Sequence, residues 1–241
     1  MPKQRLDQAL VSLGLVTTRS QAESYVRLGK VTVNGQVETK AGTMVNDSSA
    51  IKLTATEQYV SRAGLKLASI AQVLKIDFRN KTVLDVGSST GGFTDYALQH
   101  GARKVLAVEV GSNQLHPSLH GDPRIELHEK TDIRNFKTTE NIDIVVADVY
   151  FTSLRDLLPS IAKLVTPSTE LALMVKPQFE AAASNLKHKG IIKNDKIRRQ
   201  ILKDFEDWAR PSFSIVDKAD SLVAGAKGNR ERFYLLKKLH I

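Results

Sequence analysis

The feature that most constrains the fold is an alternation of strand-like and helical segments that begins near residue 81. Strand-like runs lie at Thr82–Val86, Lys104–Val110, Ile125–His128, Ile142–Ala147, Leu171–Val175, Phe213–Lys218 and Arg232–Leu236. Helical patterns lie between most of them. This alternation predicts an α/β fold with a mostly parallel, doubly wound, Rossmann-like sheet. A short link joins the last two runs, so we expect them to form an antiparallel hairpin.

The first 54 residues follow a different pattern, which predicts a small α+β domain. Amphipathic helices are expected over residues 5–14 and 19–28, with Ser20 as the cap of the second. Short strands flank the turn Asn34-Gly35, and Ile51–Leu53 is expected to close the small sheet. We therefore predict one domain over 1–54, a linker over 55–60 and a second domain over 61–241 that opens with a helix near 62–75.

Composition excludes several classes of protein. The chain of 241 residues has no Cys, which excludes disulfide scaffolds, Cys-ligated metal sites and a Cys nucleophile. No apolar run is long enough to span a membrane, and the N-terminus does not resemble a signal peptide, so we expect a cytoplasmic protein. The six His residues show no metal-ligand spacing, so no metal is predicted. A net charge of +9 favours a polyanionic partner such as nucleic acid.

A Gly-rich loop follows the first strand of the second domain. Its glycines stand at Gly87, Gly91 and Gly92, a spacing that matches neither the dinucleotide fingerprint nor a phosphate-binding P-loop. Asp85 at the strand end repels phosphate and attracts a cation, and Glu109 ends the next strand, where an acid can bind a ribose. This combination favours S-adenosylmethionine, which carries a ribose, a sulfonium and an ammonium but no phosphate.

The alternative is a Gly-rich turn that merely connects a strand to a helix. Asp132 follows the third strand-like run, where it either accepts a hydrogen bond from the adenine amino group or is a surface acid. The residues that we expect to contact the cofactor are Asp85, Gly87, Ser89, Thr90, Gly91, Gly92, Phe93, Glu109 and Asp132.

Four charged residues stand where the sheet is expected to bring them together. Asp148 and Lys176 each end a strand, and ligands of open parallel sheets bind outside the carboxyl ends of the strands. A lysine directly after the run Leu171–Val175 needs a partner, because burying an unpaired ammonium is costly. Lys66 comes from the leading helix and Glu231 from the final hairpin. Two ordinary Lys–acid ion pairs are the alternative interpretation.

The chain resembles the TlyA family, a group of haemolysin-named proteins related to the FtsJ rRNA 2′-O-methyltransferases. The resemblance covers nearly the whole chain and rests on these segments: Ser61–Leu67, Asp85–Gly87 with Thr90–Thr94, Asp148-Val149-x-Phe151, Val175–Glu180 and Gly228-Asn229-x-Glu231.

The family implies transfer of a methyl group from S-adenosylmethionine to a cytidine 2′-hydroxyl of ribosomal RNA, with a catalytic tetrad at Lys66, Asp148, Lys176 and Glu231. Four positions depart from the family pattern, and none is in the tetrad. Tyr150 replaces the usual Ser, Ala63 replaces a Gly, and Ala226-Lys227 replace Pro-Glu.

The chemistry of 2′-O-methylation suits these residue types. A ribose hydroxyl must lose its proton as the oxygen attacks the methyl group. A lysine accepts a proton near neutral pH only when its pKa is lowered, and a second cation nearby lowers it. We therefore expect Lys176 to be the base, Lys66 to be the cation that activates it, Asp148 to hold Lys176, and Glu231 to orient Lys66 or the hydroxyl.

The N-terminal segment resembles the alpha-L RNA-binding module, which occurs in a small-subunit ribosomal protein and in bacterial tyrosyl-tRNA synthetases. The resemblance rests on Arg5-Leu6-Asp7-x-x-Leu10, Thr18–Ala22 and Gly29–Gly35. It predicts one RNA-binding face that consists of Arg5, Arg19, Ser20, Gln21, Arg27 and Lys30. A solvated surface is the alternative, since residues 1–60 carry a net charge of only +2, from 7 basic and 5 acidic residues.

A basic run over residues 187–203 either binds the RNA backbone or is a solvated helix face.

Two other functions compete with the methyltransferase. A membrane-lytic haemolysin would need an apolar helix, a long alternating hairpin or an export signal, and the sequence has none of them. A non-catalytic RNA-binding or ribosome-assembly factor would not need the tetrad, which is intact.

Overall fold

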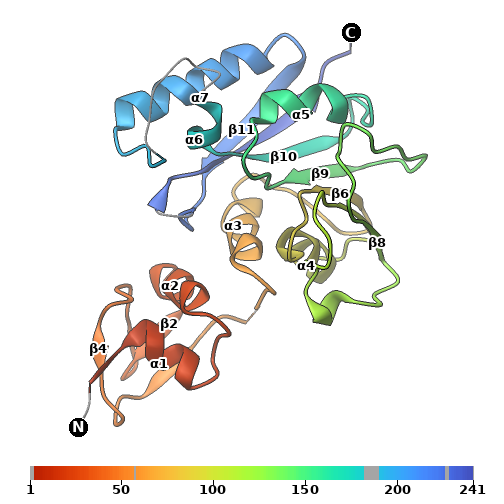
Figure 1. The fold of residues 1–241 in the computed structure, drawn as a ribbon. Helices are drawn as coiled ribbons and strands as arrows, with labels where there is room; N and C mark the ends of the chain where they lie inside the picture. Colours follow the sequence, from red (N-terminus) through yellow and green to blue (C-terminus); the bar gives the residue numbers. More distant parts are fainter. Residues whose placement is uncertain (1–2, 57, 182–189, 226–227, 241) are drawn as a thin grey trace.

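A seven-stranded sheet forms the centre of the second domain (Figure 1). The computed structural model describes residues 3–56, 58–181, 190–225 and 228–240. The parallel part of the sheet runs, in spatial order, through β8 (Ile125–His128), β7 (Lys104–Val108), β6 (Thr82–Val86), β9 (Ile144–Ala147) and β10 (Glu170–Val175). The predicted α/β fold and its strands are confirmed, within two residues at each end.

The last two strands complete the sheet as an antiparallel pair, as predicted. β12 (Arg232–Lys238) lies beside β10, and β11 (Phe213–Asp220) forms the edge. The strand order reverses between β6 and β9, so a crevice opens at the carboxyl ends of these strands. Residues that follow β6, β7 and β9 therefore meet at one edge of the sheet.

Helices cover both faces of the sheet (Figure 1). On one face lie α3 (Arg62–Ala71) and α4 (Gly92–Gln99), and on the other lie α5 (Leu154–Ile161), α6 (Pro177–Glu180) and α7 (Asp195–Ala209). Alternate residues of one strand enter the two cores: Val83 packs on the side of α3 and α4, and Leu84 on the side of α5 and α7. Burial on both faces explains why the central strands β6, β7, β9 and β10 read as largely apolar runs.

The N-terminal unit has the predicted helices and hairpin. It contains α1 (Leu6–Ser12), α2 (Arg19–Arg27) and a three-stranded sheet of β2 (Val31–Val33), β3 (Gln36–Val37) and β5 (Ile51–Leu53). A further pair, β1 (Gln4–Arg5) with β4 (Met44–Val45), was not predicted, because strands of two residues show no hydrophobic period. Pro117–Leu119 forms a short 3₁₀ helix, η1.

The expected cap of α2 was wrong. Thr18, not Ser20, is the N-cap, and its side chain accepts a hydrogen bond from the backbone N–H of Gln21. Ser20 lies one residue inside the helix, where its hydroxyl instead accepts a hydrogen bond from Arg62 at 2.6 Å. This contact joins the N-terminal unit to α3.

Further contacts join the two units. The amide of Gln21 donates to the carbonyl of Tyr59 at 3.0 Å, and Tyr59 is buried. Arg62 also donates to the Ser24 hydroxyl at 3.2 Å and to the carbonyl of Ala224. The segment expected to be a polar linker therefore supplies a buried ring to the core, while the boundaries at 54 and 61 remain a prediction. Within the described ranges, no helix is long and apolar enough to cross a membrane.

Candidate active site

A cleft of about 620 Å³ opens at the carboxyl ends of β6, β7, β9 and β10. It is lined by the loop after β6, by the end of β7, by residues 131–134 and 148–152, and by Lys176. Seven of the nine predicted cofactor residues line it, and these are Asp85, Gly87, Ser89, Thr90, Phe93, Glu109 and Asp132. The fold therefore gathers at one cleft residues that are widely separated in the sequence.

Gly91 and Gly92 have a structural role that the sequence did not show, while their contact with the cofactor stays a prediction. Gly91 is the N-cap of α4 with φ +86°, and a Cβ there would overlap Leu119. A Cβ on Gly92 would overlap the N-terminal turn of α3, at Ser61. These glycines thus allow close approach of protein segments, which fixes α3 beside the start of α4.

Asp85 is a buried acid with one oxygen that is still available. Its side chain is 1% exposed, and Thr94 donates to Oδ2 at 2.7 Å, whereas Oδ1 has no hydrogen-bond partner among the described residues. Burial, together with the charges of Asp148 and Glu109, raises the pKa of Asp85 to about 7 against the hydrogen bonds from Thr94. An orphaned carboxylate oxygen in a cleft fits a cationic ligand.

Glu109 and Asp132 are both held in place on the cleft wall. The Glu109 carboxylate accepts hydrogen bonds from the backbone N–H groups of Ser89 at 2.9 Å and Gly111 at 2.7 Å. Asp132 pairs with Arg134, and this hydrogen bond lowers the pKa of Asp132. Each carboxylate keeps spare lone pairs. The two acids are therefore charged acceptors that fit hydroxyl and amino donors of a nucleoside.

The four predicted catalytic residues form one network. Lys176 lies 2.5 Å from Oδ1 of Asp148, and Lys66 lies 3.7 Å from Oδ2 of the same carboxylate. Lys66 also lies 2.6 Å from Glu231. The exposed fractions are 8% for Lys66, 7% for Lys176 and 2% for Glu231. Two buried cations thus share one carboxylate, and their total charge is balanced by two acids.

Gly225 makes room for this network. A Cβ at this position would overlap the Glu231 carboxylate. The backbone N–H of Gly225 donates to the carbonyl of Asn229 at 2.9 Å, which closes the loop just before β12. In the Gly-Asn-x-Glu motif, the Asn229 carbonyl accepts this hydrogen bond and Glu231 pairs with Lys66.

Comparison with known proteins identifies the family. Residues 59–238 match FtsJ-like methyltransferases, and residues 4–51 match the S4 domain. This chain belongs to the FtsJ-like methyltransferase family. The resemblance to TlyA proteins and the methyltransferase fold that were predicted from the motifs are both confirmed.

Relatives extend over most of this FtsJ-like methyltransferase. Hemolysin A of Brachyspira hyodysenteriae is 38% identical, over 94% of this chain and 97% of its own length. The 23S rRNA (cytidine-2′-O)-methyltransferase TlyA of Campylobacter jejuni is 42% identical, over 74% of this chain and 71% of its own. A solved structure of a hemolysin-named protein from Streptococcus thermophilus has 36% identity and a TM-score of 0.71, covering 99% of this chain and 89% of its own.

The S4 domain of this methyltransferase presents only part of the predicted RNA-binding face. Arg5 and Arg19 both pair with Asp7, at 2.8 and 2.9 Å, and Asp7 is buried. Their hydrogen bonds lower the pKa of Asp7 against its burial. Gln21 is also buried, and its amide contacts Thr17 as well as Tyr59. Sequence reasoning missed Asp7, although an acid between basic residues in a motif is a visible signal.

The rest of the predicted face is more accessible. Arg27 and Lys30 are exposed, and Ser20 is half-buried against Arg62. Arg5 and Arg19 also keep part of their side chains in solvent beside Asp7. The structure therefore separates Arg27 and Lys30, which are open to an RNA phosphate, from Gln21, which joins the two domains.

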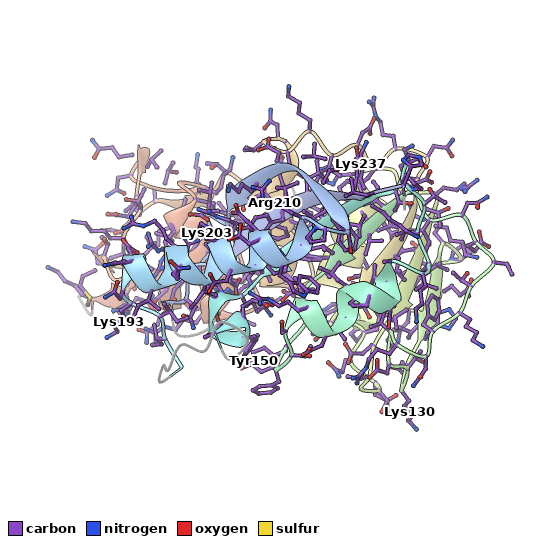
Figure 2. The ribbon with its side chains drawn as sticks, turned by 90° about the horizontal axis from the view of Figure 1, so that it is seen from above. Lys130, Tyr150, Lys193, Lys203, Arg210 and Lys237 are labelled. Atoms are coloured by element: carbon purple, nitrogen blue, oxygen red, sulfur yellow. The ribbon has the colours of Figure 1, made fainter. Side chains whose placement is uncertain are left out.

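The basic run has mixed surroundings. Lys187 and Lys189 lie outside the described residues. On α7, Lys203 pairs with Asp207, while Arg198 is buried and binds Asp220 at 2.7 Å. Figure 2 shows Lys193 near the start of α7, with Lys203 and Arg210 along it. Among the described residues of this run, Arg198 and Lys203 are therefore paired with acids of the same domain.

Three aromatic rings beside Lys176 were not predicted as part of the site. Tyr150 and Phe151 are 56% and 81% exposed, and the ring of Phe179 lies 5.2 Å from that of Tyr150 and 6.0 Å from that of Phe151. The ammonium of Lys176 lies 5.3 Å from the Tyr150 ring. In Figure 2, Tyr150 projects outward beside α6. Each ring stands within three residues of Asp148 or Lys176, which was the available signal.

No group of three or more His, Asp or Glu side chains in the described part of the chain is arranged to hold a metal ion.

Proposed function

We propose that this methyltransferase transfers a methyl group from S-adenosylmethionine to a ribose 2′-hydroxyl of ribosomal RNA, with cytidine as the target nucleoside. The observation that carries the proposal is the buried network in which Lys66 and Lys176 share the Asp148 carboxylate beside the cleft. The names of the TlyA relatives support the same substrate.

The cleft fits the cofactor. When bound, S-adenosylmethionine supplies an electrophilic methyl group on a positively charged sulfonium. Asp85 offers its unpartnered Oδ1 to a cationic group, Glu109 accepts hydrogen bonds from ribose hydroxyls, and Asp132 accepts one from the adenine amino group. Ser88, whose buried hydroxyl has no partner among the described residues, adds a further polar contact on this wall.

Lys176 accepts the proton of the attacking hydroxyl in this mechanism. Asp148 and the carbonyl of Val149, 2.8 Å away, fix its amino group at the edge of the cleft. Lys66 balances the shared carboxylate and, with Glu231, orients the hydroxyl for in-line attack. Holding the hydroxyl and the methyl group together supplies ~7 kcal/mol or more of the rate enhancement through effective molarity.

The exposed rings offer a surface for the target base. A nucleobase must leave its stack before its ribose can enter a cleft of this kind, and bases stack readily on aromatic side chains. Phe151 lines the cleft with its ring largely in solvent and a backbone φ of +61°. We assign Phe151 to base stacking beside Lys176.

Phe151→Ala should lower kcat/KM for ribosomal RNA about 10- to 100-fold, because base–aromatic stacking contributes ~1–3 kcal/mol. Methyl transfer at saturating cofactor measures the effect. Val216→Ala, which removes a side chain of the exposed edge strand β11, is the control and should leave the rate unchanged. An unaltered kcat/KM in Phe151→Ala would contradict the stacking role.

RNA capture is assigned to the S4 domain. Arg27→Ala combined with Lys30→Ala should weaken rRNA binding and flatten its salt dependence, by about 0.7–0.9 in the log–log slope for each lost phosphate contact. These side chains are exposed, so the fold should survive, whereas Arg5→Ala or Arg19→Ala leaves Asp7 short of a partner. Filter binding over a salt series measures the slope.

Arg79→Ala is the matched charge control, since this exposed Arg precedes β6 at the opposite end of the strand from the cleft. Its salt slope should equal that of the wild type. If the double variant also keeps the wild-type slope, Arg27 and Lys30 do not bind RNA.

The function itself is tested by mapping 2′-O-methyl groups on rRNA from a strain that lacks this protein. We expect one or more cytidine 2′-O-methyl groups to disappear and to return when purified protein and S-adenosylmethionine are added to the ribosomal subunits. An unchanged methylation map would contradict the proposal.

A further inference from the structure

Glu180 is a buried acid to which the mechanism above gives no role. It ends α6, the short helix that begins directly after Lys176. Its side chain is 1% exposed, and burial raises its pKa, against hydrogen bonds from Ser153 and Leu154. Burying a carboxyl group destabilises the fold unless the group is hydrogen-bonded or paired with a charge, so the contacts of Glu180 need to be identified.

Among the described residues, the hydrogen bonds and the ion pair of the Glu180 side chain are to the segment that follows the aromatic residues. Its Oε2 accepts a hydrogen bond from the Ser153 hydroxyl at 2.6 Å, and its Oε1 accepts one from the backbone N–H of Leu154 at 2.7 Å. Arg155 lies 3.4 Å from Oε2. Glu180 therefore fixes the point at which residues 149–152, here called the aromatic loop, enter α5.

The other end of the aromatic loop is held by the same short helix. Lys176 donates to the carbonyl of Val149 at 2.8 Å, and Phe179 packs on the rings of Tyr150 and Phe151. Pro177 stands in the first turn of α6, where its fixed φ stabilises the helix start. The segment Lys176–Glu180 thus contacts the aromatic loop at both ends and in the middle.

We propose that Glu180 is a positioning residue that sets the aromatic loop, and with it the target nucleotide, relative to Lys176. This inference rests on the proposed function, because it takes the loop as the platform for the base. A simple helix cap would stabilise α5 without affecting turnover below the unfolding temperature. A positioning residue affects turnover at constant stability, since a misplacement of about 1 Å costs about 10²-fold in rate.

The test compares three variants of the full chain. Glu180→Ala removes both acceptor oxygens. Glu180→Gln keeps one oxygen that can accept from the backbone N–H of Leu154, and its NH₂ group can donate to the Ser153 hydroxyl oxygen. Asn194→Ala is the matched control, because it removes the side chain that caps α7 by accepting from Lys196 and Ile197. Single-turnover methyl transfer is measured with ribosomal subunits and labelled S-adenosylmethionine, together with calorimetric cofactor affinity and unfolding temperature.

We expect Glu180→Ala to lose about 10²-fold in the single-turnover rate, with cofactor affinity close to that of the wild type. Glu180→Gln should recover most of this loss. Asn194→Ala should lower the unfolding temperature but keep the rate. Equal rates in Glu180→Ala and Asn194→Ala would overturn the positioning role, as would a Glu180→Gln variant as slow as Glu180→Ala.

A second measurement needs no RNA and separates this inference from the proposed function. Backbone hydrogen exchange over residues 149–154 should quicken in Glu180→Ala and stay at the wild-type rate in Asn194→Ala. Unchanged exchange over these residues would overturn the proposal that Glu180 holds the aromatic loop, even if methylation is confirmed. If the wild type does not methylate ribosomal subunits, the proposed function fails, while the exchange result still decides whether Glu180 holds the loop.

Discussion

Replacing Lys176 with Ala should abolish methyl transfer while cofactor binding is retained. A general base contributes about 10²–10⁴-fold, and the variant also leaves Asp148 without its 2.5 Å partner. Because the cofactor contacts of Asp85 and Glu109 are on other strands, calorimetry should give a near wild-type affinity for S-adenosylmethionine. A single-turnover assay with ribosomal subunits and labelled cofactor measures the loss.

Lys176→Arg distinguishes a base from a structural cation. Arg keeps a positive charge next to Asp148, but it does not release a proton near neutral pH. If Lys176 accepts the hydroxyl proton, the Arg variant should be nearly as inactive as the Ala variant. A rate within about tenfold of the wild type, far less than the loss of a general base, would remove Lys176 as the base.

Lys203→Ala is a suitable control for charge and expression. Lys203 lies exposed on α7 in an ion pair with Asp207, away from the cleft. Exposed pairs of this kind contribute only ~0–1 kcal/mol to stability. The control should therefore have wild-type stability and turnover.

The central strands of the sheet could be predicted from the sequence because they are buried on both faces. The run Leu171–Val175 is apolar throughout, and such a run can be recognised without knowledge of the tertiary fold. The same holds for the sites at strand ends: Asp148 and Lys176 follow apolar runs, so their meeting at one sheet edge follows from parallel topology.

The parts that were wrong or missed depend on contacts between segments distant in the chain. Thr18 and Ser20 are both suitable caps, and only the position of Arg62 shows why Ser20 serves another purpose. The close approach of Gly91 to Leu119 and of Gly92 to Ser61 was missed because these neighbours come from other segments, while the assignment of both glycines to ligand approach stays a prediction. The pairing of Asp7 with Arg5 and Arg19 likewise requires the fold of the S4 domain.

The four residues of the proposed catalytic network come from four separate segments. Lys66 lies on α3, Asp148 after β9, Lys176 after β10 and Glu231 before β12. Arg62 stands one helical turn before Lys66 and donates both to α2 of the S4 domain and to the Ala224 carbonyl, next to Gly225. The S4 domain is thus attached to the two segments that supply Lys66 and Glu231.

Asp85→Asn should abolish cofactor binding and at the same time stabilise the free protein above neutral pH. The amide removes the charge that attracts a cationic ligand, yet its oxygen can still accept the hydrogen bond from Thr94. The pKa of Asp85 is raised to about 7 in the fold, so the folded state binds more protons than the unfolded state between pH 4 and 7. The Asp85 contribution to the free energy of unfolding therefore falls as pH rises through this range.

The raised pKa of Asp85 sets the direction of two pH dependences, that of the free energy of unfolding and that of the cofactor affinity. Each pH unit between the folded and unfolded pKa values is worth about 1.4 kcal/mol, so Asp85→Asn should gain a few kcal/mol over the wild type at pH 8 and little at pH 4. Cofactor affinity of the wild type should rise with pH up to about 7, because a neutral Asp85 must lose its proton before it attracts the cation. Denaturant unfolding and calorimetry at pH 6 and pH 8 measure the two effects.

Thr94→Val tests whether the pH dependence of cofactor affinity comes from the titration of Asp85. Losing the hydroxyl that donates to Asp85 at 2.7 Å should raise the pKa of Asp85 further, because that hydrogen bond favours the charged form. The midpoint of the affinity curve should therefore move to higher pH in Thr94→Val. If affinity is independent of pH in the wild type, or if Asp85→Asn binds as tightly as the wild type, Asp85 is not the residue that holds the cationic part of the cofactor.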